Sequence, residues 1–182
     1  MFAKGVKRVS AFPIARPEVE EYPAYYRTYV DKLAGADAIR LLGGQRDAAI
    51  TSLRSISEER SVFRYAPEKW SIRELLGHLI DSERVFTYRA LRFARADATP
   101  LAGFDEDAYV RASGYHVRDF RDIVDEFESV RGATLSFFGG LTPEQSMLRG
   151  TANQGAFTVR ALAYIVGGHV EHHLGVLRDR YL

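Results

Sequence analysis

Hydrophobic side chains recur at helical spacing in four long segments of the chain. In residues 117–138, apolar side chains return every three or four positions and form one stripe, made up of Phe120, Ile123, Val124, Phe127, Val130, Leu135 and Phe138. Residues 36–56, 71–96 and 158–181 show the same period, which predicts an amphipathic helix in each. No segment alternates apolar and polar residues between turn signals, as the strands of a hairpin do. The pattern therefore predicts an all-α fold, most simply a four-helix bundle.

Capping and turn residues indicate where helices begin and what separates them. Ser71, followed three residues later by Glu74, forms a capping box at the start of the second helix. The connections at 97–116 and 139–157 are each about 20 residues long, and loops of that length are usually functional or contain a short helix. The sequence LTPEQ in the second connection is typical of a short helix, because its proline directly follows a threonine cap. The predicted bundle thus has long inter-helix connections.

The chain ahead of the first long helix divides into an arm and a tyrosine-rich segment. Residues 1–17 are basic but have no apolar core of about 7 residues or more, so a signal peptide is not expected there. Residues 20–33 read EEYPAYYRTYVDKL and predict a short helix interrupted near Pro23. A chain of 182 residues suits one domain. We therefore expect a single helical-bundle domain over residues 1–182, with an N-terminal arm at 1–17.

Composition and charge exclude several classes of function. Lysine and arginine total 25 against 24 aspartate and glutamate, and this balance lacks the basic excess of a nucleic-acid-binding domain. The longest uncharged apolar run, ALAYIVGG, is far shorter than the roughly 20 residues that span a bilayer. We therefore expect a cytoplasmic protein that does not enter a membrane. The chain has no cysteine, which excludes disulfides, thiolate metal ligands and a cysteine nucleophile.

Three of the five histidines lie close together in the sequence GGHVEHH, residues 167–173. On the last predicted helix, His169 and His173 lie one turn apart within the apolar arc. His172 lies near the edge of that arc, and Glu171 points away from it. Buried imidazoles need partners. Two interpretations stay open: a pair of core histidines that hydrogen-bond to the backbone or to each other, or two nitrogens that converge on one metal ion.

His78 adds a third histidine from the second predicted helix, where it borders the apolar face. Three neutral imidazoles from two facing helices would form a facial site with one open coordination position, which is typical of catalytic rather than structural zinc. The metalloprotease motifs HExxH and HxxEH do not fit the last histidine pair, because Val170 and His172 stand where each motif requires glutamate. His116, in a predicted loop, is expected to be exposed to solvent.

Other polar residues near the histidines are further candidates. Asp81, one turn after His78, could orient an imidazole, or it could be a solvated carboxylate on the helix face. Trp70, just before the cap, is expected to be a packing anchor rather than a platform for substrate.

Arginines and amides could hold a ligand near the same helices. Arg84, Arg89 and Arg92 form a basic side of the second helix. Arg89 and Arg92 are the candidates for binding the carboxylates of a peptide-like thiol, and a solvated charged face is the alternative. Asn153 and Gln154 lie in the loop before the last helix and are expected to line the cleft.

Two stretches resemble the DinB-like superfamily of metal-binding four-helix bundles, which includes the YfiT-like metal-dependent hydrolases. Residues 65–95, YAPEKWSIRELLGHLIDSERVFTYRALRFAR, are similar to the family's Trp-Ser-x-x-x-x-x-x-His-x-x-Asp pattern. Residues 157–182, FTVRALAYIVGGHVEHHLGVLRDRYL, are similar to its His-x-x-x-His pattern. The intervening PLAGFDEDAYV also looks familial, so the resemblance covers nearly the whole chain from residue 36 onward.

The resemblance implies a divalent metal, commonly Zn or Ni, bound by one histidine of the second helix and two of the fourth. The matching residues are His78, His169 and His173. It also implies a homodimer and a small-molecule substrate. Some members of the family are S-transferases that use a low-molecular-weight thiol such as bacillithiol, mycothiol or glutathione, and one branch is a thiol-dependent isomerase.

A zinc ion held by three histidines, with one open position, supports two kinds of chemistry. It can lower the pKa of a bound water to about 7, or it can deprotonate an incoming thiol. Because the chain has no cysteine, any thiolate has to come from a cofactor.

Three hypotheses follow from these observations. The leading one is a metal-dependent enzyme that acts on small electrophiles through the three-histidine site, as a thiol S-transferase or a hydrolase. The alternative is a non-catalytic metal- or ligand-binding bundle with a role in stress response, because no general base is evident within the histidine motif itself. The third is a structural bundle whose core histidines are satisfied by hydrogen bonds.

Overall fold

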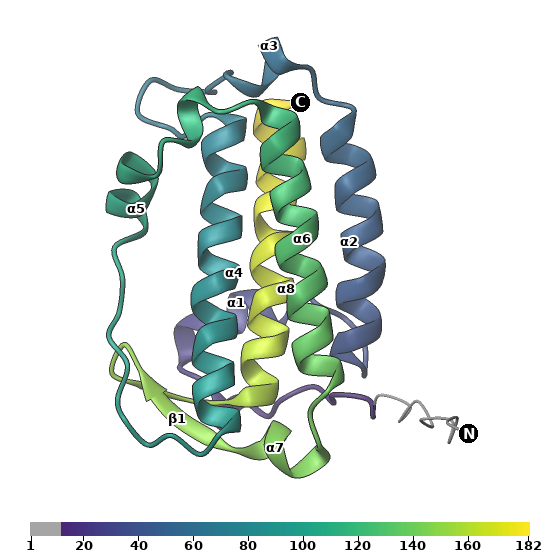
Figure 1. Cartoon of the computed structure of the whole chain (residues 1–182), viewed down its shortest axis with the longest axis vertical. Helices are drawn as coiled ribbons and strands as arrows, with labels where there is room; N and C mark the ends of the chain where they lie inside the picture. Colours follow the sequence, from purple (N-terminus) through teal and green to yellow (C-terminus); the bar gives the residue numbers. More distant parts are fainter. Residues whose placement is uncertain (1–11) are drawn as a thin grey trace, which may run out of the picture.

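The computed structural model describes residues 12–182, and four long helices form its body (Figure 1). These helices are α2 (Ala38–Arg54), α4 (Ile72–Ala94), α6 (Phe120–Gly139) and α8 (Val159–Val176). The prediction of an all-α four-helix bundle is therefore confirmed. Each helix differs from its predicted bounds by a few residues at the ends, where fraying and capping rather than periodicity decide the boundary.

The direction of the helices explains one of the long connections. In Figure 1, α4 and α6 both run downward, whereas α2 and α8 run upward. The chain therefore has to return along the length of the bundle between α4 and α6. This connection contains α5 (Glu106–Ser113) and a 3-10 turn (Tyr115–Val117). Both α2 and α4 pack against α6 and α8.

The connection between α6 and α8 contains a β-hairpin that the hydrophobic pattern did not predict. α7 (Pro143–Met147) begins at the LTPEQ sequence, as predicted. β1 (Arg149–Ala152) and β2 (Gly155–Thr158) then pair antiparallel around Asn153 and Gln154, which both have positive φ. Two positive φ values in a two-residue loop match the twist of a hairpin. Strands of four residues are too short to show a clear alternation of apolar and polar positions.

The tyrosine-rich segment folds into short helical turns beside α8. Two 3-10 turns, Val19–Glu21 and Ala24–Tyr26, lead into α1 (Arg27–Val30), and Pro23 lies at the predicted interruption. α1 packs directly against α8. This segment therefore covers α8 on one side of the bundle.

The two chain ends differ from their predictions in detail. Residues 1–11 of the predicted N-terminal arm lie outside the described residues, and residues 12–17 reach the bundle without helix or strand, with Ile14 fully buried. The last helix changes after α8 into a π-helical turn (Leu177–Tyr181), and α3 (Glu58–Ser61) closes the same end of the bundle. None of the helices in residues 12–182 has the length and apolar character needed to cross a membrane.

Candidate metal centre

The three predicted histidines meet inside the bundle. His78 comes from α4, and His169 and His173 come from consecutive turns of α8, which runs antiparallel to α4. One ring nitrogen of each histidine lies within 4.8 Å of those of the other two. The Nε2 atoms of His78 and His169 are 3.1 Å apart. His78 and His169 are buried and His173 is half-buried, so the cluster lies at the edge of the core.

Burial keeps these imidazoles neutral. Desolvation lowers the pKa of His78 to about 4 and, together with the neighbouring histidines, that of His173 to about 3. Desolvation and the two other rings also lower the pKa of His169 well below its ordinary value. The neutral imidazole is the form that binds a metal ion. The cluster is therefore in its metal-binding protonation state at neutral pH.

Two histidines of the cluster have hydrogen-bond partners within the chain, and the third is incomplete. Nε2 of His78 lies within hydrogen-bonding distance of Nε2 of His169, and Nδ1 of His78 lies 3.5 Å from the Ser82 hydroxyl. Within the described part of the chain, Nδ1 of His173 is buried and has no hydrogen-bond partner. A buried nitrogen without a partner costs about 1–3 kcal/mol. A lone pair directed at a cation needs no hydrogen bond, and imidazole ligands suit Zn or Ni. The residues present therefore fit the divalent metal that the resemblance implies.

Aromatic side chains enclose the cluster, and a glycine allows one of them to reach it. Tyr29 of α1 lies edge-on to His169 with ring centroids 5.2 Å apart, and the half-buried Trp70 packs on His78 at 4.6 Å. A Cβ at Gly168 would lie 1.9 Å from the carbonyl oxygen of Tyr29. Only glycine permits so close an approach of the two backbones. The glycines of GGHVEHH thus bring the tyrosine-rich segment to the histidines.

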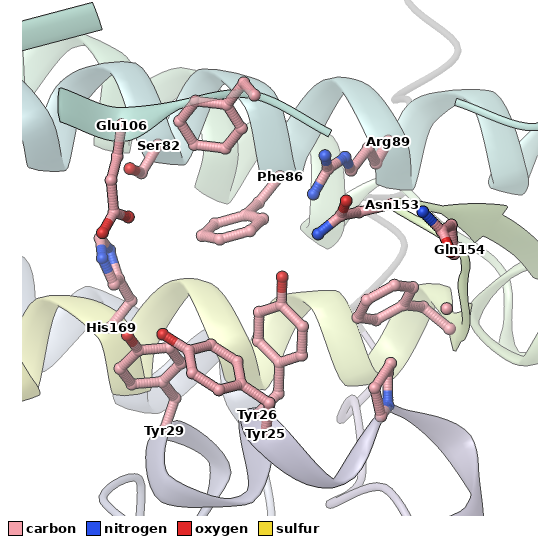
Figure 2. Close-up of a pocket in the computed structure, with 14 residues that line it drawn as sticks. Tyr25, Tyr26, Tyr29, Ser82, Phe86, Arg89, Glu106, Asn153, Gln154 and His169 are labelled. Atoms are coloured by element: carbon pink, nitrogen blue, oxygen red, sulfur yellow. The ribbon is translucent and has the colours of Figure 1, made fainter. Parts of the chain in front are cut away.

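Two cavities border the cluster. The tyrosine cavity, of about 480 Å³, is lined by His169, by aromatic side chains of several elements and by Arg89 (Figure 2). The tryptophan cavity, of about 390 Å³, is lined by His173 and Trp70. Glu106 of α5 lines both cavities and lies at the same end of the tyrosine cavity as His169 in Figure 2.

Asp81 does not orient His78, contrary to one of the two interpretations of this residue. Its carboxylate accepts a hydrogen bond from the Tyr115 hydroxyl at 3.3 Å and lies 3.6 Å from Arg84. A residue three positions along a helix is rotated by about 60° from the first, and a residue four positions along by about 40° in the opposite sense. Ser82, four positions after His78, therefore lies nearer to its face of the helix than Asp81 does, and the Ser82 hydroxyl is 3.5 Å from Nδ1 of His78.

The two arginines proposed from the sequence as ligand-binding residues lie in different environments. Arg89 is buried, lines the tyrosine cavity and donates a hydrogen bond to the carbonyl oxygen of Ala102. Arg92 is not among the residues that line this cavity; its guanidinium pairs with Asp97 and donates to the hydroxyl of Tyr88. The structure therefore places Arg89 on this cavity, whereas the helix position of Arg92 turns it toward the α4–α5 connection.

The lining of the tyrosine cavity includes residues that the sequence predicted and a carboxylate that it did not. Asn153 and Gln154 line the tyrosine cavity as expected. Glu106 was not predicted, and the only signal for it is its place within the familial stretch PLAGFDEDAYV. Burial raises the pKa of Glu106, and the nearby Asp107 and Asp105 add to this effect.

The two remaining histidines lie beside the cluster or away from it. His116 is exposed in the 3-10 turn after α5, as predicted. His172 is half-buried, lines the tryptophan cavity and lies edge-on to Tyr29 with ring centroids 5.6 Å apart. Neither histidine belongs to the group of three whose nitrogens converge.

The fold and the site together define a class of protein: a helical bundle with a three-histidine cluster between two antiparallel helices. The family model of the DinB superfamily matches residues 41–177, and the chain belongs to this superfamily. The fold is similar to that of YfiT from Bacillus subtilis, described as a probable metal-dependent hydrolase with an unusual four-helix bundle topology. The TM-score is 0.68 at 14% identity, over 90% of this chain and 89% of that chain. The comparison with curated proteins gave no match.

Proposed function

We propose that this protein is a metal-dependent enzyme that transfers a low-molecular-weight thiol, such as bacillithiol, mycothiol or glutathione, to a small electrophile. His78, His169 and His173 would hold the divalent metal. The observation that carries the proposal is a neutral three-histidine cluster at the edge of the core, bordered by two cavities. The description of YfiT as a metal-dependent hydrolase supports the metal but not the choice of reaction.

The residues of the chain supply the conditions for this chemistry. A divalent cation, when bound, makes a coordinated thiol or water more acidic. Burial keeps the imidazoles neutral, and the rings of Tyr29 and Trp70 pack against His169 and His78. Because the chain has no cysteine, the thiol has to be a separate molecule.

The two cavities favour transfer between two molecules over hydrolysis of one. His169 lines the tyrosine cavity and His173 lines the tryptophan cavity, so a thiol and an electrophile can approach the cluster from separate sides. Hydrolysis would need one substrate cavity and water. Glu106 lines both cavities and is the carboxylate placed to accept the proton that a thiol loses.

Metal content measured by elemental mass spectrometry tests the site. We expect about one metal per folded chain in the wild type, by the stoichiometry of three-histidine sites, and loss of it in His78→Ala, His169→Ala and His173→Ala. His116→Ala, which removes an exposed histidine outside the cluster, should keep the metal. A wild type that contains no metal and takes up neither zinc nor nickel would contradict the proposal.

Turnover of monochlorobimane with each of the three thiols tests the reaction. Thiol conjugation that depends on the metal and is lost in the cluster variants is the expected result. Metal binding without turnover of any thiol would instead favour a non-catalytic metal-binding bundle.

A further inference from the structure

One buried arginine differs from the others in what it contacts. Among the described residues, Arg73, Arg89 and Arg131 are buried. Arg73 and Arg131 each form an ion pair with a glutamate. Arg89 is only 2% exposed, yet it has no ion pair with any described carboxylate; its hydrogen bond goes to the carbonyl oxygen of Ala102 at 2.9 Å.

A buried cation without a counter-ion is costly, because the protein interior does not replace its hydration shell. Desolvation lowers the pKa of Arg89, and the hydroxyl of Tyr26 beside it is the group that offsets this most. The side chain also lies near the rings of Phe86 and Phe104, with 5.9 Å from the guanidinium carbon to each centroid. These contacts position the guanidinium and leave its charge without an anionic partner.

The guanidinium and the metal site lie toward opposite ends of the tyrosine cavity. Figure 2 shows Arg89 and Asn153 at one end, and His169 and Glu106 at the other. A volume of about 480 Å³ is within the range of small-molecule sites, and aromatic rings such as that of Phe86 form the walls. The cavity therefore offers one cationic end, an aromatic middle and a reactive end.

The helix geometry aligns these two ends. Arg89 follows His78 by three turns of α4 and points from nearly the same face, about 16 Å further along the axis. A ligand that contacts both ends therefore has to be elongated and flat enough to lie between the rings.

We propose that the tyrosine cavity binds an aromatic or unsaturated monocarboxylate, with its carboxylate on Arg89 and its reactive end toward the histidine cluster. A guanidinium binds a carboxylate through two parallel hydrogen bonds. A single negative charge matches one guanidinium, because Glu106 at the other end repels a second. The proposal rests on the proposed function only for the role of the reactive end.

Binding of 3-phenylpropionate, compared with that of its neutral amide 3-phenylpropionamide, tests the anion site. Both would be titrated calorimetrically into the full chain, first with chelator and then with one equivalent of zinc. We expect the acid to bind at least about tenfold more tightly than the amide in both forms, the effect of a hydrogen bond to a charged group. The form without metal is decisive, because a carboxylate cannot bind there to zinc.

Variants of α4 assign the preference to one residue. Arg89→Met should abolish the preference for the acid, whereas Arg92→Met, one turn further along and outside the cavity, should keep it. Arg89→Lys serves if Arg89→Met does not fold: it should retain a preference for the acid but bind it more weakly, because lysine loses the second parallel hydrogen bond.

Equal affinity for acid and amide in the wild type, or a preference that survives in Arg89→Met, would overturn the proposal. Competition by inorganic phosphate as strong as that by the acid would overturn the choice of a carboxylate. An acid preference in a chain that binds no metal would leave the anion site standing while the proposed enzyme fails. Metal binding without a preference for the acid would leave the metal site standing while the anion site fails.

Discussion

Two faces of α4 differ in whether their buried charged side chains form an ion pair. Toward α6, Glu83 accepts two hydrogen bonds of 2.8 Å from Arg131, and the same guanidinium donates a third, also of 2.8 Å, to Gln45 of α2. Toward the tyrosine cavity, Arg89 is equally buried but has no carboxylate partner among the described residues. The histidine cluster lies on this second side, and there Nδ1 of His173 is left without a hydrogen bond.

The difference separates polar groups that hold the bundle together from polar groups that are available to a ligand. Buried polar groups in folded proteins are nearly always hydrogen-bonded, so unpaired ones require an explanation. The network of Glu83, Arg131 and Gln45 is satisfied within the chain and joins three long helices. Among residues 12–182, Arg89 has no carboxylate partner and Nδ1 of His173 has no hydrogen bond, and both side chains line cavities. Their missing partners are the basis of both proposals.

The largest effect on stability is expected on the satisfied face. Arg131→Met leaves the Glu83 carboxylate buried and unpaired, so the free energy of unfolding should fall by about 3–5 kcal/mol in urea denaturation. The double variant Arg131→Met/Glu83→Leu removes both charges and should recover much of this loss. A double variant as unstable as the single one would show that packing, and not the ion pair, is responsible.

Metal binding should stabilise the protein through the incomplete face. Zinc at a hundred times its Kd should raise the free energy of unfolding by about 2.7 kcal/mol, because only the folded chain presents the site. Urea denaturation with zinc and with chelator measures this difference. It should disappear in His173→Ala and persist in His116→Ala. Equal stabilisation of both variants would place the metal elsewhere.

The same face should make the metal-free protein sensitive to acid. The pKa of His78 is about 4 in the folded chain against an ordinary value of 6.5, so between these values the unfolded chain binds a proton that the folded chain does not. The contribution of His78 to the free energy of unfolding is therefore fully present above pH 6.5 and is lost as the pH decreases toward 4. At pH 5.5 the loss should be about 1 kcal/mol per histidine with such a shift.

Urea denaturation in chelator at pH 7.5 and 5.5 measures this loss. His78→Leu should reduce it, and His116→Ala should leave it unchanged because that histidine is exposed. An identical loss in His78→Leu would attribute the acid sensitivity to other groups.

The smallest effect on stability is expected for Arg89→Met. This variant removes a buried charge that has no carboxylate partner in the described part of the chain, so the free energy of unfolding should change by less than about 1 kcal/mol or increase. The same urea denaturation measures it beside Arg131→Met. A loss as large as that of Arg131→Met would show that both faces of α4 are structural, and the comparison between them would fail.

The histidine cluster could be predicted from the sequence because its information is local. A spacing of four residues places His169 and His173 on one face of any helix. His78 only borders the apolar face of its helix, and the family resemblance is what assigned it to the same site. The same local signals predicted the capping box at Ser71 and the short helix of the LTPEQ sequence, and the structure confirms both.

The surroundings of the cluster could not be predicted in this way. Tyr29 of α1 and Glu106 of α5 are far apart in the sequence, and no periodicity relates them to the histidines. Arg89 and Arg92 look equivalent along the chain, yet one is buried against the cavity and the other pairs with Asp97.

The sequence by itself determined four amphipathic helices, the face that each buries and a set of three histidines able to meet. Only the tertiary structure decided that α4 and α6 run the same way, that the returning connection brings Glu106 to the cluster, and that Gly168 lets Tyr29 enclose it. The physical reason is that helical periodicity depends on a few neighbouring residues. The partner of each buried face depends instead on how distant segments pack around a common core.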